Sequence, residues 1–367
     1  MKVLVITNTL HERSGSGRYS RGVVVNLQNK GVEVTVLCER GSAELAVVQY
    51  PLLSAGSPVA FIRNVLCARR LAREVDVVHA FDGWPFAVYG YFARLGTSKK
   101  FFTNGVGTYT VAPLYSFWQG PLLRRAYEAA EHIFCISTYV KDQLLKAGIS
   151  SAIPTVVHLG TDALTSSSPE DESKYRAELS ISEARYPIIL TVGDVKNRKG
   201  QFDTLQAVEI LKEKYPQILY VVVGTSNASY AQKMHEYAES HGLTDNLRVV
   251  SSIDDAKLSF LYSICTIVAL NSNNTEPEHH FEGFGLVVIE GYQFGKPAVG
   301  SRNCGIEDAI VDGRTGLLTN QSDPADIAEK MERVIENLPT FSHNARMEYP
   351  RFSWQSTVAA YLKAYQK

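Results

Sequence analysis

Cysteines are scarce in this chain of 367 residues, and no two of them are close together. The five are odd in number and scattered, at Cys38, Cys67, Cys135, Cys265 and Cys304. They form neither a CxxC pair nor the framework of a disulfide-rich domain. This pattern predicts a protein of a reducing compartment, the cytoplasm.

Long apolar runs and metal-binding motifs are also missing. No stretch approaches the about 20 apolar residues that a transmembrane helix needs. The first residues, MKVLVITNT, soon turn polar and lack a small-residue cleavage site, which predicts a buried strand rather than a signal peptide. There is no Asp-x-Asp, and the adjacent His279 and His280 are more typical of a surface than of a metal site. No metal site is therefore predicted.

The length and composition indicate a soluble protein of two domains. Apolar residues make up 45% of the chain and charged residues 20%, and 367 residues exceed one ordinary core. The net charge of −1 hides an asymmetry: residues 1–160 hold 17 Lys+Arg and 10 Asp+Glu (+7), which leaves 37 − 17 = 20 and 38 − 10 = 28 (−8) for the rest. The basic half can attract phosphates or lipid head groups, although solvated faces explain the charge somewhat better.

Strand-like runs alternate with helix-length segments in both halves. Such alternation predicts an α/β fold whose parallel sheets are covered by helices on both faces. The expected strands are residues 3–7, 33–37, 76–80, 100–104, 132–136, 154–158, 186–194, 218–224, 247–250, 265–270 and 297–300.

The polar segment TDALTSSSPEDES, residues 161–173, separates the two series of strands and is the expected linker. We therefore expect two doubly wound, Rossmann-like domains, residues 1–160 and 161–351, that face a central cleft. Residues 352–367 have helical spacing and are expected to pack back on the first domain. Ligands of such sheets bind at the carboxyl ends of the strands.

A glycine-rich loop, ERSGSGRYSRG, follows the first expected strand. Gly15 and Gly17 allow a ligand to approach the backbone, and the start of the next helix attracts anions. A dinucleotide site would have glycine in place of Ser20, with Glu39 as its acid. A dehydrogenase is therefore a weak alternative, and a plain tight turn remains open.

The stretch FEGFGLVVIEG places two glutamates eight residues apart around a glycine turn. A helix is expected to begin near Gly285, so Glu282 lies in the loop and Glu290 in the helix. Eight residues are not a whole number of turns, and the two carboxylates do not share a face. Carboxylates accept hydrogen bonds from paired hydroxyls, such as those of a ribose and a sugar ring. Alternatively, a neighbouring side chain satisfies Glu290.

The segment from residue 281 to 318 resembles the signature of the retaining, nucleotide-sugar-dependent glycosyltransferases of family 4, which have the GT-B fold. Glu-x7-Glu, Gly-Lys-Pro-x-Val and Asp-Gly-x-Thr-Gly-Leu all match. Residues 190–208, 156–162 and 135–144 resemble the family's phosphate loop, interdomain turn and last N-domain helix start. The resemblance covers nearly the whole chain.

The resemblance implies a role for each residue that it matches. Glu290 would bind the donor ribose, Glu282 would bind the donor sugar near the reaction centre, and Lys199 would neutralise the leaving diphosphate. Glu282 and Lys199 are thus the expected catalytic residues. The remaining donor-binding residues would be Arg198, the backbone of Phe284, Gly285 and Leu286, and Gly15 and Gly17.

Two positions depart from the family pattern. Asp194 stands where an arginine that binds phosphate is usual, and we expect it to orient Arg198 as a replacement. Val106 stands where the family has a histidine that contacts sugar. Asn104 or Thr108 would then contact the sugar or acceptor.

The resemblance implies retaining, metal-independent transfer of a hexose-type sugar from a nucleotide diphosphate. No cofactor is expected beyond the sugar nucleotide, with UDP or GDP as the nucleotide. The acceptor would be a glycan or a lipid-linked precursor in cell-envelope polysaccharide or glycolipid biosynthesis, and nucleic acid is not expected. Peripheral contact with the inner face of the membrane would use the basic first domain, with Arg63, Arg69, Arg70, Arg73, Arg124 and Arg125. The alternatives are a nucleotide-sugar epimerase of this fold and a catalytically silent homologue that binds nucleotide sugar.

Overall fold

The computed structural model describes residues 1–11, 14–54, 56–165, 168–225, 227–251 and 253–367. The chain divides into two compact units. The first consists of Met1–Asp162, Pro277–Gly283 and Phe352–Lys367, and the second consists of Ala163–Glu276 and Phe284–Arg351. Residues 277–283 thus group with the first unit, although they lie within the range expected for the second domain.

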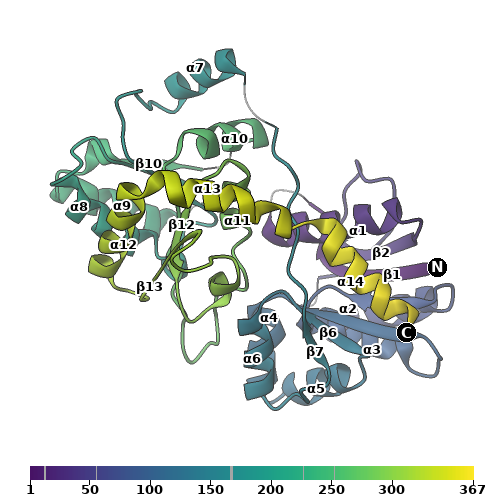
Figure 1. Ribbon diagram of the computed structural model, residues 1–367. Helices are drawn as coiled ribbons and strands as arrows, with labels where there is room; N and C mark the ends of the chain where they lie inside the picture. The colour runs from purple at the N-terminus through teal and green to yellow at the C-terminus, as the bar shows by residue number, and fades with distance from the viewer. Residues whose placement is uncertain (12–13, 55, 166–167, 226, 252) are drawn as a thin grey trace. The chain divides into compact units, whose positions relative to one another are not determined.

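The first unit contains a seven-stranded parallel sheet in the order β3-β2-β1-β4-β5-β6-β7. Strands β1, β2, β6 and β7 of this sheet are labelled in Figure 1. Strand β1 is buried along most of its length and pairs with β2 on one side and β4 on the other. The strands are β1 (Lys2–Thr9), β2 (Glu33–Arg40), β3 (Val48–Pro51), β4 (Val77–Ala80), β5 (Lys100–Gly105), β6 (His132–Cys135) and β7 (Pro154–Val156).

Helices surround this sheet, and the last of them comes from the end of the chain. They are α1 (Gly15–Asn29), α2 (Pro58–Ala72), α3 (Val88–Arg94), α4 (Thr108–Val111), α5 (Gly120–Glu128), α6 (Thr138–Lys146) and α14 (Trp354–Gln366), with the short turns η1 (Gly83–Ala87) and η2 (Ala112–Tyr115). Trp354 of α14 lies against Gly22 of α1, where a Cβ atom would stand 2.3 Å from the indole. Its Nε1 donates to Asp162 Oδ1 at 2.9 Å.

The second unit contains a six-stranded parallel sheet in the order β10-β9-β8-β11-β12-β13. Its strands are β8 (Ile188–Val192), β9 (Leu219–Val223), β10 (Leu247–Val250), β11 (Ile267–Leu270), β12 (Ala298–Ser301) and β13 (Gly316–Thr319). The helices are α7 (Pro169–Glu178), α8 (Gln201–Lys212), α9 (Ala228–Ser240), α10 (Asp255–Ile264), α11 (Leu286–Gln293), α12 (Pro324–Glu336) and α13 (Leu338–Glu348), with turns η3 (Asn197–Lys199), η4 (Thr244–Asn246), η5 (Gly305–Asp308) and η6 (Tyr349–Arg351).

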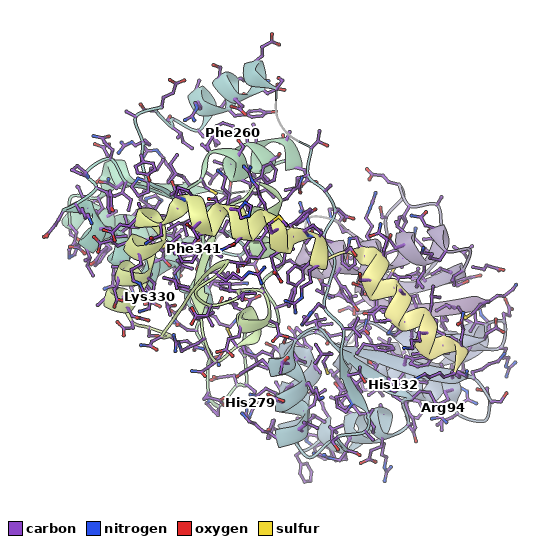
Figure 2. The ribbon with its side chains drawn as sticks, in the orientation of Figure 1. Arg94, His132, Phe260, His279, Lys330 and Phe341 are labelled. Atoms are coloured by element: carbon purple, nitrogen blue, oxygen red, sulfur yellow. The ribbon has the colours of Figure 1, made fainter. Side chains whose placement is uncertain are left out.

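Alternate residues of β8 enter two different hydrophobic clusters. Ile189 packs with the cluster that contains Phe341, whereas Leu190 packs with the cluster that contains Phe260 (Figure 2). Successive side chains of a strand point to opposite faces, so the sheet has a core on each side. This confirms the predicted fold class of two Rossmann-like α/β domains.

Two strands and one helix were not expected from the sequence. Strand β3 is short and lies at the sheet edge, with Val48 57% exposed, so it lacks a buried apolar run. Strand β13 lies in a glycine-containing motif. Helix α7 begins inside the expected linker, where the Ser168 side chain accepts from Asp171 N at 3.2 Å.

Candidate functional site

The turn after β8 brings Lys199 over the end of that strand. Gly193 has φ of +140°, and a Cβ built there would lie 3.9 Å from Lys199 Nζ. Gly200 has φ of +63°, and its Cβ would stand only 1.7 Å from Asn271 O. Glycine is therefore required at residue 200, and the turn lies tightly against the segment after β11. The Lys199 side chain consequently lies at the carboxyl edge, where ligands of doubly wound sheets bind.

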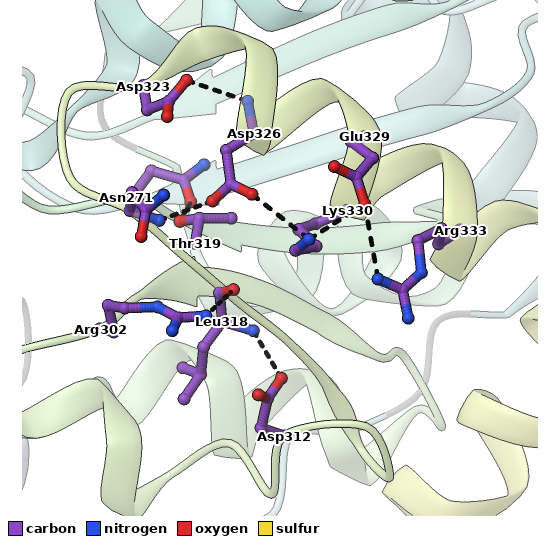
Figure 3. Close-up of polar contacts among 11 residues, drawn as sticks. Asn271, Arg302, Asp312, Leu318, Thr319, Asp323, Asp326, Glu329, Lys330 and Arg333 are labelled. Atoms are coloured by element: carbon purple, nitrogen blue, oxygen red, sulfur yellow. Dashed lines mark hydrogen bonds and ion pairs between the residues drawn. The ribbon is translucent and has the colours of Figure 1, made fainter.

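Asn271 links three segments at this edge of the second sheet. Its Oδ1 accepts from Thr319 Oγ1 at 3.1 Å (Figure 3), and its Nδ2 donates to Thr204 Oγ1 at 3.0 Å. The side chain is 2% exposed, so these bonds satisfy a buried amide. Asn271 therefore fixes the segment after β11 to α8 and to the end of β13.

A second polar link holds the backbone at Arg198. Asn273 N donates to Arg198 O at 2.7 Å, and Asn273 Nδ2 donates to Asp203 Oδ2 at 2.6 Å. Burial raises the pKa of Asp203, and the bond from Asn273 lowers it by a smaller amount. The link places the Arg198 backbone beside the segment after β11.

Asp194 forms an ion pair with Lys196, with Oδ2 and Nζ 2.9 Å apart. Both side chains are more than two-fifths exposed, at 62% and 44%, so this pair contributes little stability. The expected orientation of Arg198 by Asp194 stays a prediction.

Helix α11 of the second unit contains a buried carboxylate, that of Glu290. It follows Gly285, which has φ of +99°. Glu290 is 6% exposed, and Tyr262 Oη donates to its Oε2 at 2.7 Å. A neighbour therefore holds one carboxylate oxygen, as in the structural alternative above, and the ribose role stays a prediction. Phe284 is buried at 2% exposure and Leu286 is the first residue of the helix.

Glu282 belongs to the first unit, where its neighbour Gly283 contacts the turn after β5. A Cβ at Gly283 would stand 2.0 Å from Val106 O, so the chain approaches as closely as only glycine permits. A Cβ at Gly107 would lie 3.9 Å from Gly283 Cα. Thr108 follows this turn directly and is partly exposed. The structure thus brings Glu282 and Thr108 to the same turn.

Two aromatic contacts hold the rest of residues 277–283. His279, labelled in Figure 2, stacks on Tyr115 with ring centroids 4.0 Å apart. Phe281 meets the Tyr139 ring edge-on at 5.1 Å. These contacts, together with the approach of Gly283 to Val106, explain why the segment groups with the first unit.

Asn104 lies in the interior of the first unit. Its Oδ1 lies 2.9 Å from His79 Nε2, and the other ring nitrogen of His79 lies 2.5 Å from Tyr365 Oη. Asn104 and His79 are both fully buried, and burial lowers the pKa of His79 to about 3. The Asn104 amide therefore joins β5 to His79 of β4, and His79 in turn contacts Tyr365 of α14. Thr108, in contrast, is partly exposed.

Gly15 and Gly17, which were expected in a loop, lie in the first turn of α1 and differ in their surroundings. A Cβ at Gly17 would stand 1.8 Å from His11 O, so a local backbone contact already requires this glycine. Among the residues that the structure describes, which do not include 12 and 13, a Cβ at Gly15 would meet no atom within 4 Å. No described residue therefore requires glycine at Gly15, whereas the backbone contact with His11 explains Gly17.

Among the residues that the structure describes, no group of three or more His, Cys, Asp or Glu side chains is placed to hold a metal ion. In that same part of the chain, no helix combines the length and apolar character required to cross a bilayer.

Two residues of these arrangements were missed in the sequence. Asn271 comes directly after the buried strand β11, and that position is a usable signal. Tyr262 lies 28 residues before its partner Glu290, and no pattern in the sequence connects them.

Two family models match the two parts of the chain. Residues 13–163 match Glycosyltransferase Family 4, and residues 172–349 match Glycosyl transferases group 1. A D-inositol 3-phosphate glycosyltransferase of Catenulispora acidiphila is 30% identical over 190 residues, which cover 49% of this chain and 43% of the relative. The chain spans about half the length of the first curated relatives that it matches, 43% and 49%.

Solved structures match over the full chain. A glycosyltransferase from Rickettsia africae has a TM-score of 0.82 at 18% identity, covering 100% of this chain and 97% of that one. The Anabaena protein HepE, solved in complex with UDP and glucose, has a TM-score of 0.82 at 19% identity and 100% coverage of both chains. These likenesses show that the chain has the GT-B fold.

Proposed function

We propose that this chain, which belongs with the GT-B glycosyltransferases of the family 4 type, transfers a hexose-type sugar from a nucleoside diphosphate to an acceptor hydroxyl with retention of configuration. The observation that supports this most is the position of Lys199 over Gly193, at the carboxyl end of β8. Bond cleavage between sugar and phosphate builds negative charge on the diphosphate. A cation fixed beside that charge lowers the barrier.

The donor site that we propose is assembled from the second unit. Lys199 and Arg198 neutralise the diphosphate, and the N-terminus of α11 after Gly285 offers backbone N–H groups to it. Glu290, held by Tyr262, accepts hydrogen bonds from the ribose hydroxyls. The UDP complex of the HepE protein supports UDP as the first nucleotide to test, with GDP next. No metal ion takes part in this proposal.

Glu282 binds the hydroxyls of the donor sugar in this proposal. Its place beside the turn of Val106 and Gly107 in the first unit supports a role apart from the nucleotide. The acceptor would be a glycan or a lipid-linked precursor in the synthesis of cell-envelope polysaccharide or glycolipid. Gly15 lies in the first turn of α1 and is retained as a donor contact.

A screen of ligands by thermal shift tests the donor assignment. Ligands that bind only the native state raise its melting temperature, by an amount that grows with concentration. We expect UDP-, GDP- or ADP-sugars to raise the melting temperature, and the bound donor to be hydrolysed or transferred when acceptors are added. Failure of every nucleotide to bind would remove the proposal.

A catalytically silent homologue that binds nucleotide sugar is the second candidate. It is favoured by Val106, whose place in the family pattern is taken by a histidine, and by the Asp194–Lys196 ion pair at the phosphate turn. This candidate predicts a thermal shift with a donor but no turnover with any acceptor. Measuring donor hydrolysis or transfer in the presence of acceptors distinguishes this candidate from an active transferase.

The first unit is also proposed to contact an anionic membrane surface. Exposed arginines and exposed aliphatic residues share the outer face of α2, a combination that suits a lipid interface. These residues are Val59, Ile62, Arg63, Leu66, Arg69 and Arg70, and Arg73 follows at the C-terminal cap of the helix. Cosedimentation with vesicles that contain anionic lipid is expected, and it should weaken in the Arg63→Glu/Arg70→Glu variant.

A further inference from the structure

Asp82 is a carboxylate at the carboxyl edge of the first sheet that the proposed function leaves unused. It lies two residues after β4, and its side chain is partly buried. Its Oδ1 accepts from Gly83 N at 2.7 Å and from Thr110 Oγ1 at 2.9 Å. Burial raises the pKa of Asp82 to about 6, against the smaller opposing effect of these two bonds.

Thr110 connects Asp82 to the turn that Glu282 adjoins. Its hydroxyl oxygen accepts from Val106 N at 2.8 Å and from Gly107 N at 3.3 Å. A threonine hydroxyl has one proton and two lone pairs, so the proton is directed to Asp82. The carbonyl oxygen of Val106 would stand 2.0 Å from a Cβ at residue 283, so this position requires glycine. Asp82 and Glu282 therefore adjoin one turn of the first unit.

The charge of Asp82 is not needed for these structural contacts. The bond from Gly83 N caps η1, and asparagine is as good a cap as aspartate. An asparagine Oδ1 would also accept from Thr110. Among the described residues, Oδ2 of Asp82 accepts no hydrogen bond, and no cationic side chain pairs with this carboxylate within 4.0 Å. A partly buried carboxylate without a cation is costly, so the charge calls for a ligand.

We propose that Asp82 binds the attacking hydroxyl of the acceptor. Gly83 and Thr110 hold Oδ1, and Oδ2 accepts a hydrogen bond from a sugar or polyol hydroxyl. Asp82 thus contacts substrate, whereas Thr110 is a positioning residue. The inference rests on the proposed function and adds the chemical class of the acceptor group: a carbohydrate hydroxyl bound in the first unit.

Asp82→Asn tests the need for charge, because it preserves both bonds to Oδ1. Using octyl glucoside, octyl galactoside and octyl mannoside as acceptor probes, we expect the acceptor KM to rise about tenfold or more, as for the loss of one charged hydrogen bond. The Kd of UDP or GDP should stay within about twofold. Asp76→Asn is the matched control: Asp76 precedes the same strand at its opposite end, where it accepts from Lys2 N. Its kinetics should equal those of the wild type.

The melting temperature of Asp82→Asn distinguishes a binding role of Asp82 from a purely structural role, because the two roles predict changes in opposite directions. The folded pKa of about 6 exceeds the ordinary 3.8, so the stabilising contribution of this group is present below pH 3.8 and is lost as pH rises through 6. At pH 8, Asp82→Asn should therefore keep or raise the melting temperature while it impairs acceptor use. If the charge of Asp82 were needed to hold the fold, Asp82→Asn would instead lower the melting temperature.

The acceptor kcat/KM of the wild type should fall as pH drops below about 6, and this acid limb should be absent in Asp82→Asn. The titratable groups that act on Asp82 from neighbouring helices are Tyr19 of α1 and Tyr127 of α5. Burial raises the pKa of both well above 10.0, so they stay neutral in this range. Thr110→Val should also raise the acceptor KM, and Thr110→Ser should restore it.

The outcomes separate this inference from the function on which it rests. If the wild type binds no nucleotide, the proposed function fails and the role of Asp82 falls with it. If nucleotide binds but no octyl glycoside binds or reacts, the carbohydrate hydroxyl is the wrong acceptor class. If transfer occurs and Asp82→Asn leaves the acceptor KM unchanged, or weakens the nucleotide equally, Asp82 does not bind the acceptor.

Discussion

Glu282 and Glu290 are eight residues apart, yet they belong to different compact units. Glu282 lies in a loop that the first unit holds through Gly283, and its side chain is partly exposed. Glu290 lies in a helix of the second unit, is 6% exposed and accepts from Tyr262. The backbone contact of Gly283 with Val106 fixes the position of the chain beside Glu282. Glu290, in contrast, is buried and accepts a hydrogen bond from the Tyr262 hydroxyl.

In our proposal, this difference allows a short motif to bind two different parts of the donor. Gly283 is the last residue of the segment that belongs to the first unit, and Gly285 is the N-cap of helix α11 in the second unit. Because the chain changes units within three residues, its two carboxylates have unrelated surroundings. We propose that Glu282 binds the sugar and Glu290 the ribose, and the predictions below are designed to separate these two roles.

The largest effect on turnover is expected from Lys199→Ala, which removes the cation over Gly193. Loss of one charged contact with the leaving group should lower kcat about tenfold to a hundredfold. Arg198→Ala should cost a similar amount, and Asp194→Ala less, because it releases the arginine without removing it. Lys196→Ala is the control, since Lys196 pairs with Asp194. Wild-type turnover in Arg198→Ala alone would show that the site uses one cation.

Glu282→Gln should reduce turnover by about tenfold, because a neutral amide is a weaker acceptor for sugar hydroxyls than a carboxylate. The substitution preserves size and leaves Gly283 against Val106. Initial rates at saturating donor give the effect on kcat. Full activity in this variant would remove Glu282 from the sugar site.

Tyr262→Phe should weaken nucleoside diphosphate about twofold to tenfold, the net value of one neutral hydrogen bond. In the proposal, its hydroxyl orients Glu290 through their hydrogen bond and does not contact the ligand. Tyr292→Phe is the matched control, because buried Tyr292 lies on α11 but bonds Thr315 and Ala309 O instead. The measurement is the Kd for UDP or GDP, with melting temperatures recorded for both variants. Equal weakening in the two would indicate a general disturbance of α11.

The smallest effect is expected from chelation. Lys199, Arg198 and the start of α11 supply the positive field in our proposal, so EDTA should leave activity unchanged. Activity is measured after dialysis against EDTA, with and without added manganese or magnesium. Loss of turnover that either ion restores would show that a metal carries out this task.

Much of the fold follows from the sequence, because buried parallel strands are continuous apolar runs. The expected strand 247–250 coincides with β10, and the other expected strands overlap observed ones. The edge strand β3 was missed because Val48 is exposed, and an edge strand needs no apolar run. The start of α11 near Gly285 was predicted correctly from its glycine turn.

The surroundings of the site residues could not be predicted to the same extent. Gly17 is explained by His11 O, and Asn104 by His79; both contacts depend on tertiary packing. Tyr262 reaches Glu290 from a separate helix, so no local pattern reveals it. The sequence therefore identifies which residues adjoin the strand ends, but not which neighbours satisfy them.

Calorimetric titration of UDP and GDP into three proteins tests the central claim most directly: the wild type, Glu290→Ala and Glu282→Gln. If Glu290 bonds the ribose and Glu282 the sugar, Glu290→Ala should raise the Kd about tenfold to a hundredfold, the value of a charged hydrogen bond. Glu282→Gln should leave the Kd within about twofold of wild type. An unchanged Kd in Glu290→Ala, or an equal loss in both variants, would contradict the assignment of separate ligands to the two glutamates.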